Sequence, residues 1–329
     1  MSFRSSHSDL VAWRQLAADG QWAELDAAFQ AVHEDDIFAP EALVLRGECL
    51  LRLGQDREAS SWASRAITTL AVRRDRTAMR MLWNQLGVAE FFSGALDRAE
   101  EAFERTLSLA RQDGDELLVA RVCNNVGMIA NIRGERDVAV GHYQLAIPAY
   151  QRIGHTRGLA ETYHNLALAS RESNQLDAAE AYERHAIEFA GLAGNDQLRV
   201  MGAIGLAETA LLRGDAPLAE RLALRAAMLS AERNDRASEA DGFRVGAAAC
   251  RAQRKFDDAA QMLLRAGASA RESGVALIQG EVAWERAQLA HMMGDEDWRT
   301  QARRALETFD RIGSAQADAV RRALEDPSA

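Results

Sequence analysis

Apolar positions recur along this chain at the spacing of amphipathic helices. In residues 96–112 the apolar and small positions are Leu96, Ala99, Phe103, Thr106, Leu107 and Ala110. Most successive members are three or four positions apart, which places them on one side of an α-helix. The pattern predicts a helix over 77–93 and a second over 96–112, with Gly94 in the turn between them and Gly114 as a left-handed C-cap.

The turn residues repeat with a period of 40 residues. One set is Gly54, Gly94, Gly134, Asn174, Gly214, Arg254 and Gly294, and a second set, displaced by 20 residues, is Gly114, Gly154, Gly194, Asn234 and Gly274. Glycine adopts the left-handed backbone of such turns most readily, and asparagine is next. A fixed period of this length is typical of stacked repeats. We therefore predict seven helical hairpins over residues 41–313.

Small residues stand at fixed distances from the first set of turns. Seven residues before them the chain has Gly47, Gly87, Gly127, Ala167, Ala207, Ala247 and Ala287, and five residues after them it has Ala59, Ala99, Ala139, Ala179, Ala219 and Ala259. Glycine or alanine at constant phase indicates that two helix backbones approach too closely for a larger side chain. No segment shows the sustained alternation of a strand. These patterns predict an all-α protein without a sheet.

The period breaks at both ends of the repeats, which predicts three parts. Residues 1–40 form an N-terminal capping hairpin, in which Trp13 and Phe29 lie at apolar positions, followed by a linker. Residues 41–313 form the seven repeats. Residues 314–329 form a C-terminal capping helix, because the end of a repeat array needs a polar outer face.

One hairpin carries the motif of a known family. Its residues at the motif positions are Trp83, Leu86, Gly87, Gly94, Ala99 and Phe103. This pattern resembles the tetratricopeptide repeat (TPR), in the 40-residue, long-helix variety of kinesin light chain, the Rap and pheromone-receptor proteins and MalT-like activators. The last three hairpins lack the aromatic positions and match less well. The resemblance implies a right-handed superhelical TPR solenoid of antiparallel helix hairpins, in which the first helix of each hairpin lines a concave groove.

Composition and charge limit the possible partners and location. The net charge is −10, which disfavours nucleic acid as a partner because nucleic-acid affinity depends mainly on Lys and Arg neutralising phosphates. No apolar run reaches the length of a membrane span, and the first residues lack the apolar segment of a secretory signal. We expect a cytoplasmic protein with no membrane partner, and the excess of Arg over Lys together with abundant Ala favours a bacterial source. The cysteines Cys49, Cys123 and Cys250 are expected to be reduced core thiols.

No motif for catalysis is present in the sequence. It contains no Walker loop, no GxGxxG, no nucleophile elbow and no HExxH, and its histidines share no ligand spacing. The acidic run at 33–36 is expected to be a solvated linker rather than a metal site. We predict that the protein is not an enzyme and holds no cofactor and no metal.

The resemblance to TPR proteins indicates which residues face the groove. The candidate partner-binding residues are Asn84, Phe91, Arg121, Asn124, Asn125, Asn131, His164, Asn165 and Arg171. Asparagine carries a donor and an acceptor, so a series of them can hold an extended peptide backbone; the alternative is that they bond within their helices or meet water. Either Phe91 or its neighbour lines the groove as an apolar anchor, or both pack against the next repeat. Two arginines among amides favour a partner with a carboxylate group.

The predicted function is therefore a protein- or peptide-binding scaffold or adaptor. A regulatory sensor, whose groove binds a signalling peptide or a small molecule, is the alternative from another class. A self-assembling homo-oligomer, in which the repeats of one copy dock on another, is a further alternative. The sequence patterns alone do not separate the three.

Overall fold

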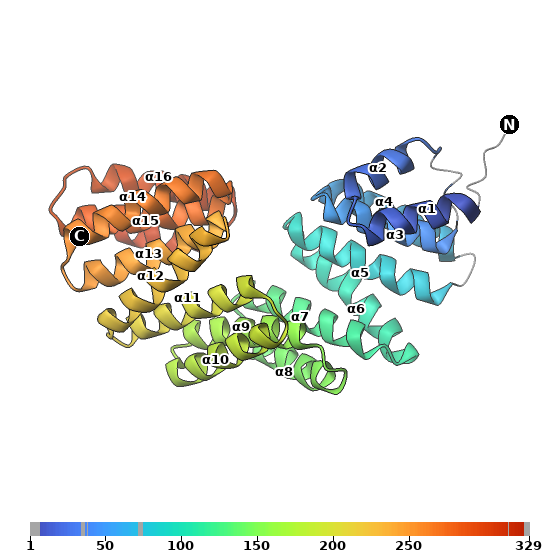
Figure 1. Ribbon diagram of the computed structural model, residues 1–329, viewed down its shortest axis with the longest axis horizontal. Helices are drawn as coiled ribbons and strands as arrows, with labels where there is room; N and C mark the ends of the chain where they lie inside the picture. The colour runs from blue at the N-terminus through green and yellow to red at the C-terminus, as the bar shows by residue number, and fades with distance from the viewer. Residues whose placement is uncertain (1–6, 34–36, 38, 72–74, 315, 326–329) are drawn as a thin grey trace. The chain divides into compact units, whose positions relative to one another are not determined.

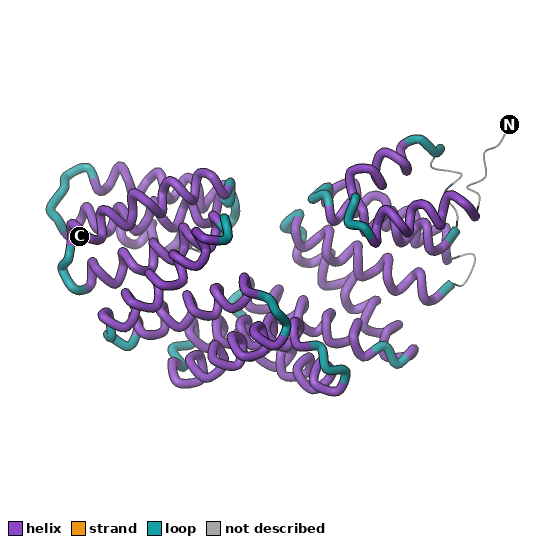
Figure 2. The backbone as a smooth tube through the Cα atoms, viewed as in Figure 1, coloured by secondary structure: helices purple, strands orange, loops and turns teal. Residues whose placement is uncertain are grey.

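The computed structural model describes residues 7–33, 37, 39–71, 75–314 and 316–325. Every regular element in these ranges is an α-helix (Figure 2), which confirms the all-α prediction. The helices are α1 (His7–Ala18), α2 (Trp22–Gln30), α3 (Pro40–Arg52), α4 (Asp56–Ala71), α5 (Arg76–Phe92), α6 (Leu96–Asp113), α7 (Glu116–Ile132), α8 (Arg136–Arg152), α9 (Thr156–Glu172), α10 (Leu176–Leu192), α11 (Asp196–Leu212), α12 (Ala216–Glu232), α13 (Arg236–Ala252), α14 (Phe256–Ser273), α15 (Ala276–Met292), α16 (Trp298–Arg311) and α17 (Gln316–Glu325).

The chain divides into two compact units. The first contains residues 1–133 and 144–153, and the second contains residues 134–143 and 154–329. Within each unit, helices that follow one another in the chain pack together, as α5 does on α6 and α13 on α14 (Figure 1). In the second unit the helices α9, α11, α13 and α15 also contact one another in succession. Consecutive hairpins therefore stack so that their first helices lie side by side, as expected for a TPR solenoid.

The predicted turns have the left-handed backbone that their sequence indicates. The φ angles are 69° at Gly54, 79° at Gly94, 81° at Gly134, 57° at Asn174, 84° at Gly214, 60° at Arg254 and 77° at Gly294. The second set of turns is also left-handed throughout, with Asn234 in place of glycine at φ 55°. Both sets of turns are thus confirmed, and Arg254 is the position where this backbone carries the largest side chain.

The close helix contacts also lie where the small residues stand. Ala99 and Ala139, five residues after their turns, are fully buried. A Cβ atom added to Gly87 would lie 2.6 Å from the Phe103 ring, closer than atoms can approach. The helices of a hairpin therefore meet through their smallest residues, and the aromatic side chains pack into the space that these residues leave open.

The first helix of most hairpins begins at a side-chain cap. Each capping side chain accepts a hydrogen bond from the backbone N–H three residues later, and the capping residues are Asp75, Asp115, His155, Asn195 and Asp235. Such caps satisfy backbone donors that a helix N-terminus leaves unpaired. Four of these caps, Asp115, His155, Asn195 and Asp235, directly follow a turn of the second set, so the start of each of these first helices is set within one residue of a turn.

The ends of the chain extend the same packing. Helices α1 and α2 form the predicted N-terminal hairpin, with the Trp13 and Phe29 rings 4.4 Å apart. At the other end α17 packs on α16. Most of the predicted acidic linker at 33–36 lies outside the described residues. The three-part division of the chain stays a prediction. In the part of the chain that the structure describes, no helix has both the length and the apolar character needed to cross a membrane.

Gly94 and Arg254 allow the backbone cost of the turns to be measured without a change in packing. A Cβ atom at Gly94 would meet no atom within 4 Å, so Gly94→Val acts only through the positive φ. We expect it to lower the free energy of unfolding by about 1–2 kcal/mol in chemical denaturation. Arg254→Gly relieves the same strain, so it should stabilise the protein by a similar or smaller amount.

Gly141 serves as the control for this pair of substitutions. It lies inside α8, and a Cβ there would also meet nothing within 4 Å. Gly141→Ala should raise stability by roughly 0.5–1 kcal/mol, because glycine is unfavourable within a helix. A destabilised Arg254→Gly protein would contradict the role assigned to the turns.

Candidate functional site

The first helices of the hairpins form the face on which the predicted site residues lie. In the first unit, Asn84 is on α5 and is partly buried, and among the described residues its Oδ1 atom has no hydrogen-bond partner. Arg121, at the start of α7, is exposed. Asn125, one turn further along α7, is partly buried. Arg121 and Asn125 thus keep side-chain surface for a partner, whereas the Oδ1 atom of Asn84 is buried.

Asn124 and Asn131 are less accessible than predicted. Both are on α7 and are buried, with 7% and 8% of their surface exposed. The side-chain amide of Asn124 donates to the sulfur of Met128 at 3.8 Å. These two residues therefore take part in packing around α7, and the prediction that they offer their amides to a partner has little support from their burial.

An apolar notch lies between α5, α6 and α7. It has a volume of about 70 Å³ and is lined by Val88, Phe91, Phe92, Phe103, Asn125 and Met128. The Phe91 and Phe92 rings are 5.5 Å apart and nearly perpendicular. Phe91 packs against the apolar core, whereas Phe92 is 67% exposed. The sequence analysis named Phe91 as the anchor, but Phe92 is the residue that the fold leaves exposed.

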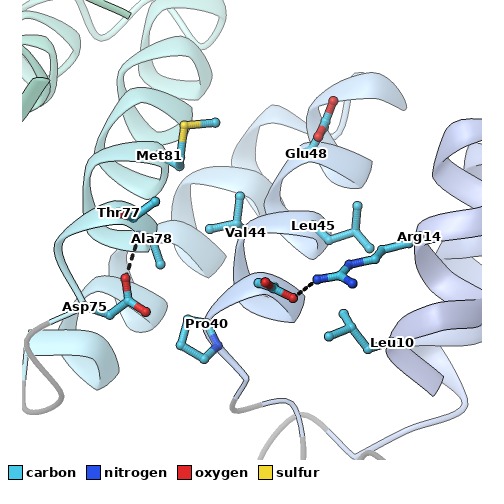
Figure 3. Close-up of a pocket in the computed structure, with 11 residues that line it drawn as sticks. Leu10, Arg14, Pro40, Val44, Leu45, Glu48, Asp75, Thr77, Ala78 and Met81 are labelled. Atoms are coloured by element: carbon cyan, nitrogen blue, oxygen red, sulfur yellow. Dashed lines mark hydrogen bonds and ion pairs between the residues drawn. The ribbon is translucent and has the colours of Figure 1, made fainter. Parts of the chain in front are cut away.

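A larger pocket lies at the N-terminal end of the first unit. It has a volume of about 470 Å³ and is lined by residues of α1, α3 and α5 with an apolar floor that includes Val44 and Met81 (Figure 3). Carboxylates stand around it: Glu41 is paired with Arg14, and Asp75 accepts a hydrogen bond from the Ala78 backbone at 2.9 Å (Figure 3). The sequence analysis did not identify this pocket.

In the second unit, two of the predicted residues meet a buried carboxylate. Glu183, on α10, has no exposed surface. Its Oε2 atom lies 3.1 Å from Nδ1 of His164, and its Oε1 atom lies 3.6 Å from Nη1 of Arg171. His164 and Arg171 are both on α9, two helical turns apart. The helix pair α9–α10 thus holds an ion-pair cluster that sequence reasoning identified only in part.

Glu183 occupies a core position of the repeat. The equivalent position, nine residues after the turn, holds Phe103, Tyr143 and Leu263 in other hairpins, and all three are buried. The carboxylate finds room because α11 has Gly205 beside it: a Cβ atom at Gly205 would lie 2.0 Å from Oε1 of Glu183. A charged residue in an otherwise apolar column was the signal that could have revealed this site.

The cluster continues onto the next first helices. Arg171 reaches Glu208 on α11 at 2.7 Å, and Glu208 also accepts from Arg244 on α13 at 2.7 Å. Arg244 contacts Asp241 at 2.6 Å and Glu281 on α15 at 3.7 Å. We call this set the charge row; its members are His164, Arg171, Glu183, Glu208, Asp241, Arg244 and Glu281.

The charge row overturns one prediction about the partner. Arg171 was expected to present a positive charge to a partner carboxylate, but it already faces Glu183 and Glu208 and only 11% of its side chain is exposed. The row also contains more carboxylates than arginines. Asn165, the last predicted residue, lies on α9 next to His164 and is partly buried.

Burial and neighbouring charges act against each other in the charge row. Burial tends to lower the pKa of His164, but Glu183 outweighs it and the pKa is raised. For Glu208, burial is outweighed by Arg171 and Arg244, which lower the pKa of this carboxyl. Asp241 and Glu281 have raised pKa values, because burial and the neighbouring carboxylates together exceed the effect of Arg244.

Side chains that could bind a metal ion and cysteine thiols are the next feature of the described residues. These residues contain no group of three or more side chains able to hold a metal ion. Burial raises the pKa of the Cys49 thiol to about 11 and that of Cys250 to about 12, so both are protonated at neutral pH. The chemistry that these surfaces support is the recognition of charged, amide and apolar groups.

Comparisons with known proteins give the same architecture. Residues 118–190 match the tetratricopeptide repeat family model. Among solved structures, a Rap protein complexed with competence and sporulation factor has a TM-score of 0.65 at 14% identity and covers 96% of this chain and 95% of its own. The quorum sensor NprR from B. thuringiensis, in its apo form, has a TM-score of 0.64 at 10% identity. The match covers 96% of this chain and 97% of NprR.

A third structure is similar over a shorter region. BtubC from P. vanneervenii has a TM-score of 0.53 at 22% identity, covering 67% of this chain and 91% of its own. None of the curated proteins compared with this sequence matches it. At these identities the solved structures establish the likeness of the fold alone.

Glu183→Gln tests the ion-pair cluster. The substitution removes the buried negative charge that faces His164 and Arg171, and breaking a buried ion pair in this way should lower the free energy of unfolding by roughly 3 kcal/mol. Because the pKa of His164 is raised in the folded protein, this pair stabilises most fully below the ordinary histidine pKa of about 6.5 and less as the pH rises through the raised value. The loss should therefore be larger at pH 6 than at pH 9 in urea denaturation.

The exposed pair His185–Glu188 provides the matched control. Its atoms are 3.7 Å apart and both side chains are more than half exposed. Glu188→Gln should change stability little at either pH, because solvent screens such pairs. An equal loss in both variants would contradict the special position of Glu183.

Proposed function

We propose that this chain, whose residues 118–190 match the tetratricopeptide repeat family model, is a binding module that holds a peptide, or an extended segment of a protein partner, on the first helices of its hairpins. The observation that carries the proposal is the notch beside Phe92. A phenylalanine that is 67% exposed stands next to partly buried amides on neighbouring first helices. An apolar side chain of a peptide fits the notch, while amides bind its backbone.

The amides near the notch suit an extended backbone. Asn125 lines the notch itself, and Asn84 lies two turns before it on α5 with Oδ1 lacking a hydrogen-bond partner among the described residues. An asparagine both donates and accepts, so it can bind a peptide group without selecting its side chain.

The comparisons support this proposal at the level of fold. One similar structure is a Rap protein bound to competence and sporulation factor, and another is a quorum sensor. Both descriptions apply to those two proteins and not to this chain. For this chain they support a protein- or peptide-binding role. A scaffold and a peptide-responsive sensor share the first step, which is the capture of a polypeptide by the repeats.

A peptide library displayed on phage tests the proposal. Panning on the purified full chain should enrich peptides that carry an apolar residue, and their affinity should fall about tenfold or more in the variant Phe92→Ala/Asn125→Ala. The reason is that the variant removes both the apolar wall and the amide, each of which contributes on the order of 1 kcal/mol or more. Fluorescence anisotropy with the enriched peptides measures the change.

The matched control is Glu104→Ala/Arg105→Ala, two exposed residues on α6, the second helix of the same hairpin. This variant should bind the enriched peptides like the unmodified protein. If instead the α6 variant loses them and the notch variant keeps them, recognition takes place on the second helices and the proposal fails.

A further inference from the structure

The charge row has fewer positive groups than carboxylates. Its acidic members are Glu183, Glu208, Asp241 and Glu281, and its permanently positive members are Arg171 and Arg244. Protonated His164 adds a third positive charge. When all four carboxylates are ionised, at least one of them therefore has no cation of its own, even if His164 is protonated.

The two arginines are shared among the carboxylates. Arg244 lies within 2.7 Å of both Glu208 and Asp241 and reaches Glu281 only at 3.7 Å. Glu281 is held further by the side-chain amide of Gln316, which donates to it at 2.6 Å. Asp241 and Glu281 thus compete for the guanidinium of Arg244. They are also the two members of the row whose carboxyl pKa is raised.

An independent observation at the other end of the row also indicates a shortage of donors. Glu183 is fully buried, and among the described residues neither its Oε1 atom nor Nη1 of Arg171 has a hydrogen-bond partner. These two atoms are 3.6 Å apart, beyond hydrogen-bonding distance. Arg171 is held off because its other nitrogen bonds to Glu208 at 2.7 Å. A buried carboxylate oxygen without a donor is costly.

The outer end of the row is open to a partner. Asp241 and Glu281 retain 27% and 17% of their side-chain surface, whereas Glu183 retains none. Both lie on first helices, α13 and α15, which contact each other. A cation from solution can therefore reach Asp241 and Glu281 but not Glu183.

We propose that Asp241 and Glu281 bind an arginine or lysine side chain of a polypeptide partner. The proposal rests on the proposed function and specifies the partner's chemistry: the segment that the second unit binds is basic. An arriving guanidinium bonds to Asp241 and Glu281 and supplies the missing positive charge. Arg244 then turns from them toward Glu208, and Arg171 is released to bond with Oε1 of Glu183.

Charge complementarity favours this occupant over an acidic one. A partner carboxylate at the same place would face Asp241, Glu208 and Glu281 at short range, with both arginines already engaged. The net charge of −10 acts in the same direction over longer distances, because it attracts a basic segment. The second unit therefore selects the partner charge opposite to that predicted from Arg171 alone.

A pair of synthetic peptides tests the charge directly. Fluorescein-labelled (Gly-Arg)₄ is compared with (Gly-citrulline)₄, in which the guanidinium is replaced by a neutral group of nearly the same shape. At about 0.15 M ionic strength, where the screening length is about 8 Å, the full chain should bind the arginine peptide at least about tenfold more tightly. In Asp241→Asn/Glu281→Gln this preference should disappear. Equal binding of the two peptides to the unmodified chain would overturn the proposal.

The control removes the same charge elsewhere in the second unit. Glu232, on α12, and Glu307, on α16, are exposed residues of second helices. Glu232→Gln/Glu307→Gln should keep the preference for arginine. A loss as large as that of Asp241→Asn/Glu281→Gln would show that the overall charge, and not the row, attracts the peptide, and the proposal would fail.

A second measurement on the unmodified chain reports the rearrangement even if a variant folds poorly. The chain has seven histidines, and the His164 ring signal is assigned by comparison with His164→Gln. Saturating arginine peptide should shift this signal and lower the pH of its titration midpoint, because Arg171 moves closer to Glu183. The citrulline peptide should leave it unchanged. A His164 signal unaffected by bound arginine peptide overturns the relay.

The two proposals fail in distinguishable ways. If library peptides depend on Phe92 and Asn125 but show no basic residues and ignore Asp241→Asn/Glu281→Gln, the basic segment is wrong and the proposed function stands. If no library peptide depends on the first helices, the proposed function fails first, and the arginine peptide then tests the charge row alone.

Discussion

The structure depends on a left-handed backbone at intervals of about 20 residues. Each such residue ends one helix and reverses the chain, so that the next helix runs antiparallel to it. Small residues then meet where the two helices touch, and aromatic rings fill the space beside them. The chain accepts Asn174 and Arg254 at this conformation, where glycine is the residue without steric cost. The packing of neighbouring hairpins is evidently strong enough to hold a strained residue in place.

The local features could be predicted from the sequence because they depend on single residues. The turn at Gly94 and the close contact at Gly87 each follow from the conformational or steric properties of one residue. The exposed anchor could not be predicted in this way. Phe91 and Phe92 are adjacent and chemically identical, and the side on which each one lies depends on how α5 is rotated against α6 and α7.

The charge row could not be predicted from the repeat pattern for a different reason. Several of its contacts join residues on different hairpins, as when Arg171 reaches Glu208, so no single repeat contains the whole row. Part of the signal was nevertheless present: Glu183 interrupts a column of buried apolar residues, and Asp241 and Glu281 share one position in successive first helices. The candidate residues chosen from the sequence were mainly asparagines and arginines, so the carboxylates that determine the sign of the local charge were not among them.

The contact between Glu183 and Gly205 restricts the order in which the two residues can mutate. Any side chain at position 205 would begin 2.0 Å from the Glu183 carboxylate, whereas shortening Glu183 first leaves room for one. The two positions are therefore epistatic. Replacing Glu183 before Gly205 is permitted, whereas replacing Gly205 before Glu183 is blocked. Position 205 is thereby constrained: while the acid is present it stays glycine, and loss of the acid removes the partner that holds His164 and Arg171 together.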